Sequence, residues 1–230
     1  MSLLAFIGNI LEPIAYLVYV AAVYLYGKKN RQPQDKVLLV YYSIGFVTML
    51  ASAVMVEMDA PETIWLYNVH ALVTVWLLGA YFRHILEGAA RKNTVTVMTA
   101  AITLYLLYKN LVLREFHLFD SVGYSLVSFS VVLYVLLYFH QLLSNVTDEN
   151  IFHNFNFWLT TGYLIYFLGS FIIFLTYHYL TTKILATFTM EEQLLLTSLW
   201  GLHNCLLFTS AGLLLGGSLW LGYRRKSVLL

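Results

Sequence analysis

The chain has 230 residues, of which 60% are hydrophobic and only 11% are charged, and its formal net charge is +1. A soluble domain carries charge on about a quarter of its residues, so this composition excludes an ordinary water-soluble domain and indicates a surface that faces lipid. The near-neutral balance gives no reason to expect a nucleic-acid partner. A lone cysteine, Cys205, cannot form an internal disulfide.

Seven stretches are long and apolar enough to cross a bilayer, for which a helix needs about 20 residues. In chain order they cover residues 3–26, 37–56, 64–82, 94–113, 121–143, 155–180 and 193–222. They predict an all-α membrane protein, a seven-transmembrane helix bundle with one transmembrane domain over residues 1–230 and no soluble domain. The first stretch lacks the basic start of a signal peptide, so we expect it to be retained. Because the connections are short, any catalysis would take place inside the bundle, and any signal would pass to a separate protein.

The basic residues predict the orientation, because Lys and Arg close to membrane spans are retained on the cytoplasmic side. Three of them flank the spans on one side, namely Lys109, Arg114 and Lys183. Ten flank the spans on the other side, namely Lys28, Lys29, Arg31, Lys36, Arg83, Arg91, Lys92, Arg224, Arg225 and Lys226. This asymmetry predicts an N-terminus outside and a C-terminus in the cytoplasm. One loop, 144–154, fits poorly, because it would be cytoplasmic but holds Asp148 and Glu149 and no basic residue.

Polar residues recur at helical spacing along several of the predicted spans. For the Thr, Ser and Gly positions, close packing between helices is the favoured interpretation; the spacing of Gly212 and Gly216 is typical of it. The tyrosines, 18 in all, differ because each is bulky and its hydroxyl needs a partner when buried. Tyrosines on inward stripes therefore favour a polar or hydrated cavity inside the bundle.

The candidate site consists of ionisable and amide side chains in the outer half of three predicted helices. Burying an isolated ionisable group in a membrane costs several kcal/mol, so each is expected to find a partner or water. These residues predict an outward-facing polar ligand pocket. They are equally able to form a hydrogen-bond network that only holds helices together, and the sequence leaves both interpretations open. The residues are Glu12, Asn68, His70, His203 and Asn204.

Several cofactor chemistries can be weighed on the same residues. A retinal Schiff base would need a lysine in the middle of the seventh span, which has none. Zinc would use Glu12, His70 and His203, although no His-x-x-x-His pair supports it. Haem b would use His70 and His84, which share a face about 21 Å apart, with His203 and His140 as their partners. We predict no cofactor, and we keep zinc and haem as alternatives.

Three segments carry a resemblance to a known family: WLYNVH at residues 65–70, FWLTTGYLIYF at 157–167 and LWGLHN at 199–204. Together they resemble a set of uncharacterised seven-helix membrane proteins of Bacteroidetes-type bacteria, which are often encoded beside sensor histidine kinases. The resemblance covers the third, sixth and seventh predicted spans. It implies a bacterial cytoplasmic (inner) membrane and a signalling partner.

The function predicted from these observations is that of a receptor-like or sensory membrane subunit rather than an enzyme. A small molecule or ion would enter from outside, and the cytoplasmic ends would pass the change to a separate effector such as a histidine kinase. A haem- or metal-dependent redox protein or hydrolase is the alternative. Candidate contacts for the effector are His84, Glu87, His140, Gln141, residues 150–156 and the basic tail at 224–226.

Overall fold

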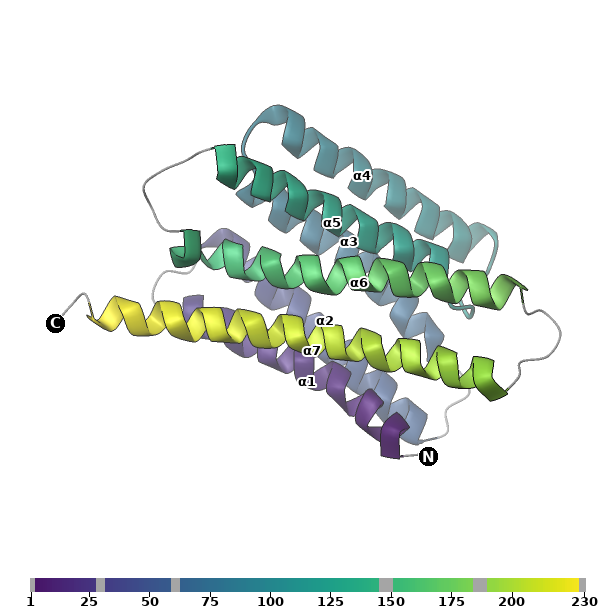
Figure 1. The fold of residues 1–230 in the computed structure, drawn as a ribbon. Helices are drawn as coiled ribbons and strands as arrows, with labels where there is room; N and C mark the ends of the chain where they lie inside the picture. Colours follow the sequence, from purple (N-terminus) through teal and green to yellow (C-terminus); the bar gives the residue numbers. More distant parts are fainter. Residues whose placement is uncertain (1–2, 28–31, 59–62, 145–150, 184–189, 228–230) are drawn as a thin grey trace.

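Seven long helices and two short helical segments make up the described part of the chain in a computed structural model (Figure 1). The structure describes residues 3–27, 32–58, 63–144, 151–183 and 190–227, and the side chains of 10–27, 32–58, 63–144, 151–181 and 194–223. A π-helical segment, η1 (Tyr108–Val112), extends the fourth helix, and a 3-10 turn, η2 (Ile151–His153), precedes the sixth. The long helices are α1 (Leu3–Gly27), α2 (Pro33–Glu57), α3 (Ile64–Ile85), α4 (Ala89–Leu107), α5 (Ser121–Ser144), α6 (Phe155–Lys183) and α7 (Met190–Ser227).

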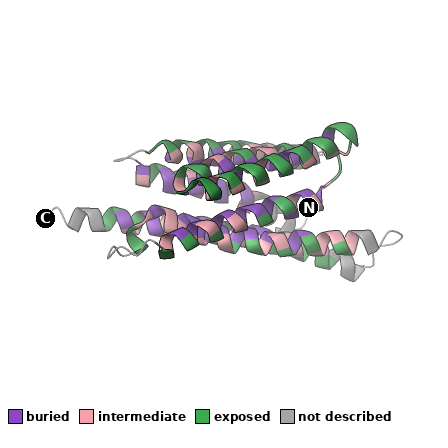
Figure 2. Cartoon of the chain, turned by 90° about the horizontal axis from the view of Figure 1, so that it is seen from above, coloured by how far each residue is buried: buried purple, intermediate pink, exposed green. Residues whose placement is uncertain are grey.

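The distribution of apolar side chains is that of a multi-pass membrane protein. All seven helices in the described residues are long and apolar enough to cross a bilayer. Large hydrophobic side chains such as Val47, Leu104 and Leu111 are more than 60% exposed on the outer faces, whereas the interior holds tyrosine, serine and histidine. Figure 2 shows this arrangement, with exposed residues on the outer faces and buried ones between the helices. The prediction of an all-α protein with seven candidate spans is confirmed.

Several helices extend beyond the predicted ranges, and the starts of α2 and α4 have local causes. Helix α2 begins at Pro33, four residues early, because proline suits the first helical position and Asp35 accepts a hydrogen bond from the Gln32 N–H at 2.9 Å. Helix α4 begins at Ala89, directly after Gly88, whose φ of 81° is favourable only for glycine. The hydropathy of these starts is low, so an apolar pattern alone places them too late.

Six of the helices form a closed ring, and α4 lies outside it. The ring runs through α1, α2, α3, α5, α6 and α7, with each helix in contact with the next and α7 returning to α1. Of the other long helices, only α3 and α5 make substantial contact with α4. Helix α4 lies at the edge of the bundle in Figure 1. Consecutive helices run antiparallel, so the N-terminus lies at one end of the bundle and the C-terminus at the other.

Buried tyrosines join helices that are distant in the sequence. The hydroxyl of Tyr19 on α1 donates to Ser210 Oγ on α7 at 2.5 Å, and the hydroxyls of Tyr42 on α2 and Tyr163 on α6 lie 2.5 Å apart. The rings of Tyr19 and Tyr42 stack at a centroid distance of 4.3 Å. Because lipid gives little hydrophobic drive to helix association, such packing and hydrogen bonds hold a membrane bundle together. The predicted polar interior therefore exists, and tyrosine forms much of it.

Candidate functional site

His70 lies on the inner face of α3 and is held by a tyrosine of α1. Its Nε2 lies 2.7 Å from the hydroxyl of Tyr16, and its ring is stacked on that of Tyr41 from α2 at 5.9 Å. The side chain is only 5% exposed, and its Nδ1 has no hydrogen-bond partner among the described residues. Buried polar atoms are almost always hydrogen-bonded. An unpartnered ring nitrogen in this place therefore indicates a site for water or a small polar ligand.

A small cavity lies against His70, and helices α1, α2, α3, α5 and α6 all contribute to its lining. Its volume is about 30 Å³, which exceeds the roughly 10–15 Å³ that one water molecule needs but is far below the ~300 Å³ of a typical small-molecule pocket. The wall is mostly apolar, and six of the residues that line it carry a hydroxyl group, namely Tyr16, Tyr41, Thr74, Tyr124, Ser128 and Tyr166. The cavity fits one or two water molecules, or a polar group of that size.

His203 on α7 approaches the same cavity through Tyr166 of α6. Tyr166 lines the cavity and its hydroxyl lies 3.3 Å from Nε2 of His203, while Ser170 Oγ lies 3.1 Å from Nδ1. The imidazole also stacks on the ring of Trp200 at 5.4 Å. His70 and His203 are thus linked through the cavity wall and not by direct contact. We call Tyr16, His70, Tyr166 and His203 the central cluster.

Glu12 joins this arrangement through another tyrosine. The buried carboxylate accepts a hydrogen bond from the Tyr67 hydroxyl at 3.3 Å, and Ser52 donates to the same hydroxyl at 3.3 Å. The backbone carbonyl of Tyr67 accepts a hydrogen bond from Tyr124, which lines the cavity. The three ionisable residues predicted for the site therefore belong to one connected polar region, although none touches another directly.

The two predicted asparagines have different surroundings. Asn68 donates from Nδ2 to the carbonyls of Phe116 and Leu118, at 2.8 and 3.2 Å, and so fastens the connection between η1 and α5 to α3. Its contacts lie outside the central cluster. Asn204 is buried on α7 next to His203 in the sequence. Asn68 thus has a structural task, while Asn204 adds a polar group to the interior of α7.

The residues named for the metal and haem alternatives lie apart from one another. In the part of the chain that the structure describes, no group of three or more His, Cys, Asp or Glu side chains is arranged to hold a metal ion. The Nε2 atoms of His70 and His203, which haem would require, face tyrosine hydroxyls at 2.7 and 3.3 Å. His84 and His140 are exposed, and Nδ1 of His140 lies 3.2 Å from the Arg91 guanidinium. Both alternatives stay predictions that spectra and metal analysis can test.

At the other end of the bundle, the predicted effector contacts divide into exposed and structural residues. His84, Glu87 and His140 are exposed. Gln141 is buried, where its Oε1 accepts the Glu87 N–H at 2.7 Å and its Nε2 donates to the Ile85 carbonyl at 3.2 Å. It therefore fixes the turn between α3 and α4. Residue 150 and the side chains of the basic tail, 224–226, lie outside the described residues.

The sequence patterns did not single out Tyr166, although it connects the two histidines. It lies about 100° around α6 from Phe167, beside the face on which Thr160, Tyr163 and Phe167 recur at helical spacing. Tyr16 on α1, and Tyr67 and Thr74 on α3, do share a face with other polar residues of their helices. The signal that could have identified Tyr166 is its position between Tyr163 and Ser170, which together widen the polar face of α6.

No family model, curated protein or solved structure matches this chain. The resemblance to seven-helix membrane proteins of Bacteroidetes-type bacteria therefore stays a prediction from the three segments that carry it. A function has to be inferred from the geometry of the central cluster and from the arrangement of the helices around it.

Proposed function

We propose that this protein is a receptor-like sensory membrane subunit whose ligand site is the cavity beside His70. The observation that carries the proposal is the unpartnered Nδ1 of a buried His70, in a cavity lined by five helices and linked to His203 through Tyr166. A group used only to hold helices together would be expected to have its hydrogen-bonding capacity filled. Ionisable residues inside membrane bundles are functional candidates for the same reason.

The contacts around the cavity can turn ligand binding into helix movement. The Tyr16–His70 bond joins α1 to α3, and the Tyr166–His203 bond joins α6 to α7. A ligand that hydrogen-bonds to His70 would compete with the Tyr16 bond, and one that hydrogen-bonds to the Tyr166 hydroxyl would compete with the His203 bond. A ligand shifts a two-state equilibrium only by its difference in affinity for the two states, about 1.4 kcal/mol for each factor of ten. A few hydrogen bonds in a low-dielectric interior are sufficient for that difference.

The size and chemistry of the cavity restrict the ligand class. Histidine nitrogen and hydroxyl groups suit a small polar molecule or ion, and a cavity of about 30 Å³ admits little more than water unless the helices separate. The lining residues lie near the middle of the bundle, with His70 six residues after the start of α3 and Tyr124 three residues after the start of α5. We infer from the distribution of Lys and Arg that these two helix starts face away from the cytoplasm, so the ligand would come from outside and the opposite end would contact a cytoplasmic effector.

The proposal requires two conformations, and spin-label distances can detect them. In a Cys205→Ser background, labels at positions 143 and 223 would report on the ends of α5 and α7, where Leu143 and Tyr223 are 71% and 75% exposed. We expect Tyr166→Phe, which removes the hydroxyl between the cavity and His203, to change the relative populations in the distance distribution measured in lipid nanodiscs.

The matched control is Tyr108→Phe, because Tyr108 is 53% exposed on η1, far from the cluster along the chain and outside its contacts. It should leave the distance distribution unchanged. If Tyr166→Phe also leaves the distribution unchanged and lowers only the thermal stability, the central cluster is a structural network and the receptor proposal is wrong.

A further inference from the structure

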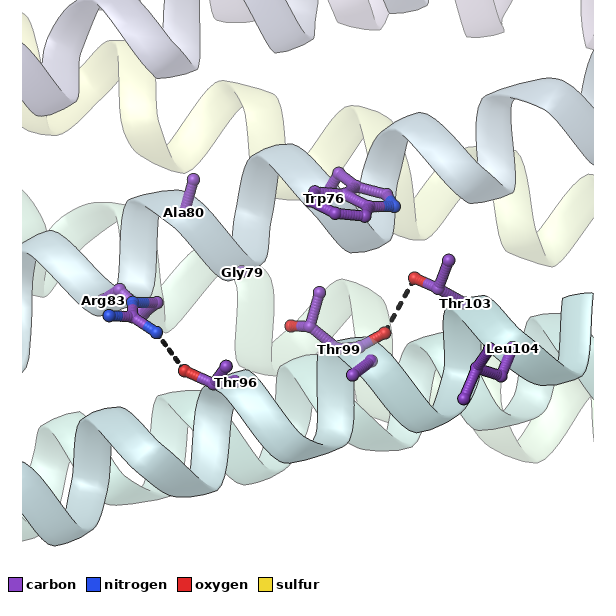
Figure 3. Close-up of a pocket in the computed structure, with 9 residues that line it drawn as sticks. Trp76, Gly79, Ala80, Arg83, Thr96, Thr99, Thr103 and Leu104 are labelled. Carbon is purple, nitrogen blue, oxygen red and sulfur yellow. Dashed lines mark hydrogen bonds between the residues drawn. The ribbon is translucent and has the colours of Figure 1, made fainter. Parts of the chain in front are cut away.

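An open groove runs between α3 and α4 on the outer surface of the bundle, away from the central cluster. Its volume is about 420 Å³, within the range of ~300–1,000 Å³ that binds small molecules. Figure 3 shows Trp76 and Arg83 on α3 facing Thr96, Thr99, Thr103 and Leu104 on α4. The threonine hydroxyls are not the main feature of the groove wall. The Thr103 hydroxyl, for example, already donates a hydrogen bond to the backbone carbonyl of Thr99 at 2.7 Å. The groove therefore offers a mostly apolar surface.

Small residues produce this groove. Gly79 and Ala80 on α3 and Ala100 on α4 line it where larger side chains would fill it. A Cβ atom at Gly79 would collide with the Thr99 side chain, so glycine here also permits the close approach of the two helices. Because α4 packs outside the ring, the outer side of the α3–α4 contact is not covered by another described helix.

One end of the groove carries an uncompensated positive charge. Arg83 is exposed, and its Nη1 donates to Thr96 Oγ1. Among the residues that the structure describes, the ion pairs found involve Lys109, and none involves Arg83. Lys92 lies one helical turn before Thr96, whose hydroxyl donates to the Lys92 carbonyl. A guanidinium retains further donors in a planar fork that suits a phosphate group.

The dimensions of the groove match one leaflet of a bilayer. Trp76 and Arg83 are seven residues apart on α3, and Thr96 and Leu104 are eight apart on α4, which corresponds to about 10–12 Å along the helices. Half of a hydrocarbon core is about 15 Å thick. Because Arg83 is two residues before the end of α3, a bilayer spanned by this helix would have its headgroups near the guanidinium and its acyl chains along the apolar part of the groove.

We propose that this groove is a binding site for an anionic phospholipid. Its phosphate would bind the Arg83 guanidinium, and one acyl chain would lie along Trp76, Ala100 and Leu104. Charge complementarity selects the lipid class, since a basic residue at the headgroup level favours anionic over zwitterionic lipid by about fivefold. The site is independent of the proposed receptor function, because it shares no residue with the central cluster.

Trp76 itself provides the probe, because it lines the groove and is 59% exposed. The full chain is reconstituted in vesicles that contain either brominated phosphatidylglycerol or brominated phosphatidylcholine, whose bromine atoms quench nearby indoles. The difference in quenching between the unsubstituted chain and Trp76→Phe isolates the signal of Trp76. We expect Trp76 to be quenched by the anionic lipid at about one fifth of the mole fraction that the zwitterionic lipid requires.

Two pairs of variants locate the site. Arg83→Gln should reduce the preference for phosphatidylglycerol to about one, whereas Arg83→Lys should retain part of it. Ala100→Leu should fill the groove and weaken quenching by both lipids, whereas Ala101→Leu, on the neighbouring exposed position of α4, should leave quenching unchanged.

Equal quenching of Trp76 by the two lipids in the unsubstituted chain would overturn the proposal. It would mean that only bulk lipid occupies the groove. This measurement needs no variant except Trp76→Phe, which isolates the Trp76 signal. A preference that survives Arg83→Gln, or quenching that Ala100→Leu and Ala101→Leu affect equally, would likewise show that the bound lipid is not where we place it.

Discussion

Replacing Tyr16 by phenylalanine tests the contact at the centre of the site. The change removes one hydroxyl and keeps the ring that packs beside His70. That hydroxyl lies 2.7 Å from Nε2 of His70, in a side chain that is 3% exposed. The next nearest group, the Thr74 hydroxyl, lies 3.5 Å from Nε2, too far for a strong hydrogen bond. Because Nδ1 has no partner either, the variant leaves the imidazole without a close hydrogen bond.

The expected loss of stability follows from the number of hydrogen-bond partners that the His70 ring retains. Hydrogen bonds between membrane helices contribute about 0.6 kcal/mol on average and at most about 1.7 kcal/mol. Since no described residue other than Thr74 offers Nε2 a hydrogen bond once this hydroxyl is lost, we expect Tyr16→Phe to lower the free energy of unfolding by about 1–1.7 kcal/mol. The control Tyr223→Phe, at a position that is 75% exposed, should change it by less than about 0.5 kcal/mol.

Reversible unfolding by sodium dodecyl sulfate in mixed micelles, followed by far-ultraviolet circular dichroism, measures both variants. A double-mutant cycle that combines Tyr16→Phe with His70→Leu isolates the pair, and we expect a coupling energy of at least about 0.6 kcal/mol. A coupling energy below about 0.3 kcal/mol, or equal losses for Tyr16→Phe and Tyr223→Phe, would show that the hydrogen bond contributes nothing.

Three further predictions concern packing, orientation and cofactors. A Cβ at Gly45 would collide with the ring of Tyr16, so Gly45→Ala should lower the free energy of unfolding by about 1–3 kcal/mol. The control Gly216→Ala should not lower it, because a Cβ at Gly216 lies in open space. In a chain without other cysteines, an impermeant maleimide should label Leu118→Cys on intact spheroplasts and Asn93→Cys only after permeabilisation; the opposite pattern would invert the topology. Protein purified from haem-replete cells should show no Soret band, and a band weakened by His70→Leu would establish the haem alternative.

The helices could be predicted from the sequence because each span is a predominantly apolar stretch of sufficient length. The predicted ranges differ from the structure mainly at their ends, as at Pro33 and Ala89, where helix starts are polar and hydropathy is low. That α4 lies outside the ring could not be predicted. Its apolar residues are no more numerous than those of its neighbours, and helix order around a bundle depends on contacts between distant segments.

The polar residues of the site could be named from the sequence, but their partners could not. Glu12, His70 and His203 stand out because ionisable groups are rare inside a membrane. That Tyr166 connects the two histidines, and that Asn68 instead holds a loop, depends on how α3 and α6 are rotated within the bundle. Helical periodicity shows which residues share a face, but not which helix that face meets.

Two side-chain amides secure α4 to its neighbours, with a consequence for how this bundle can move. Asn68 on α3 holds the segment that follows η1, and Gln141 on α5 holds the turn that precedes α4. Both connections of α4 are therefore hydrogen-bonded to neighbouring helices, and a displacement of α4 would have to break these bonds or carry α3 and α5 with it. The cavity beside His70 lies on the inner side of α3 and α5, and the Tyr16–His70 hydrogen bond joins α3 to α1 across it.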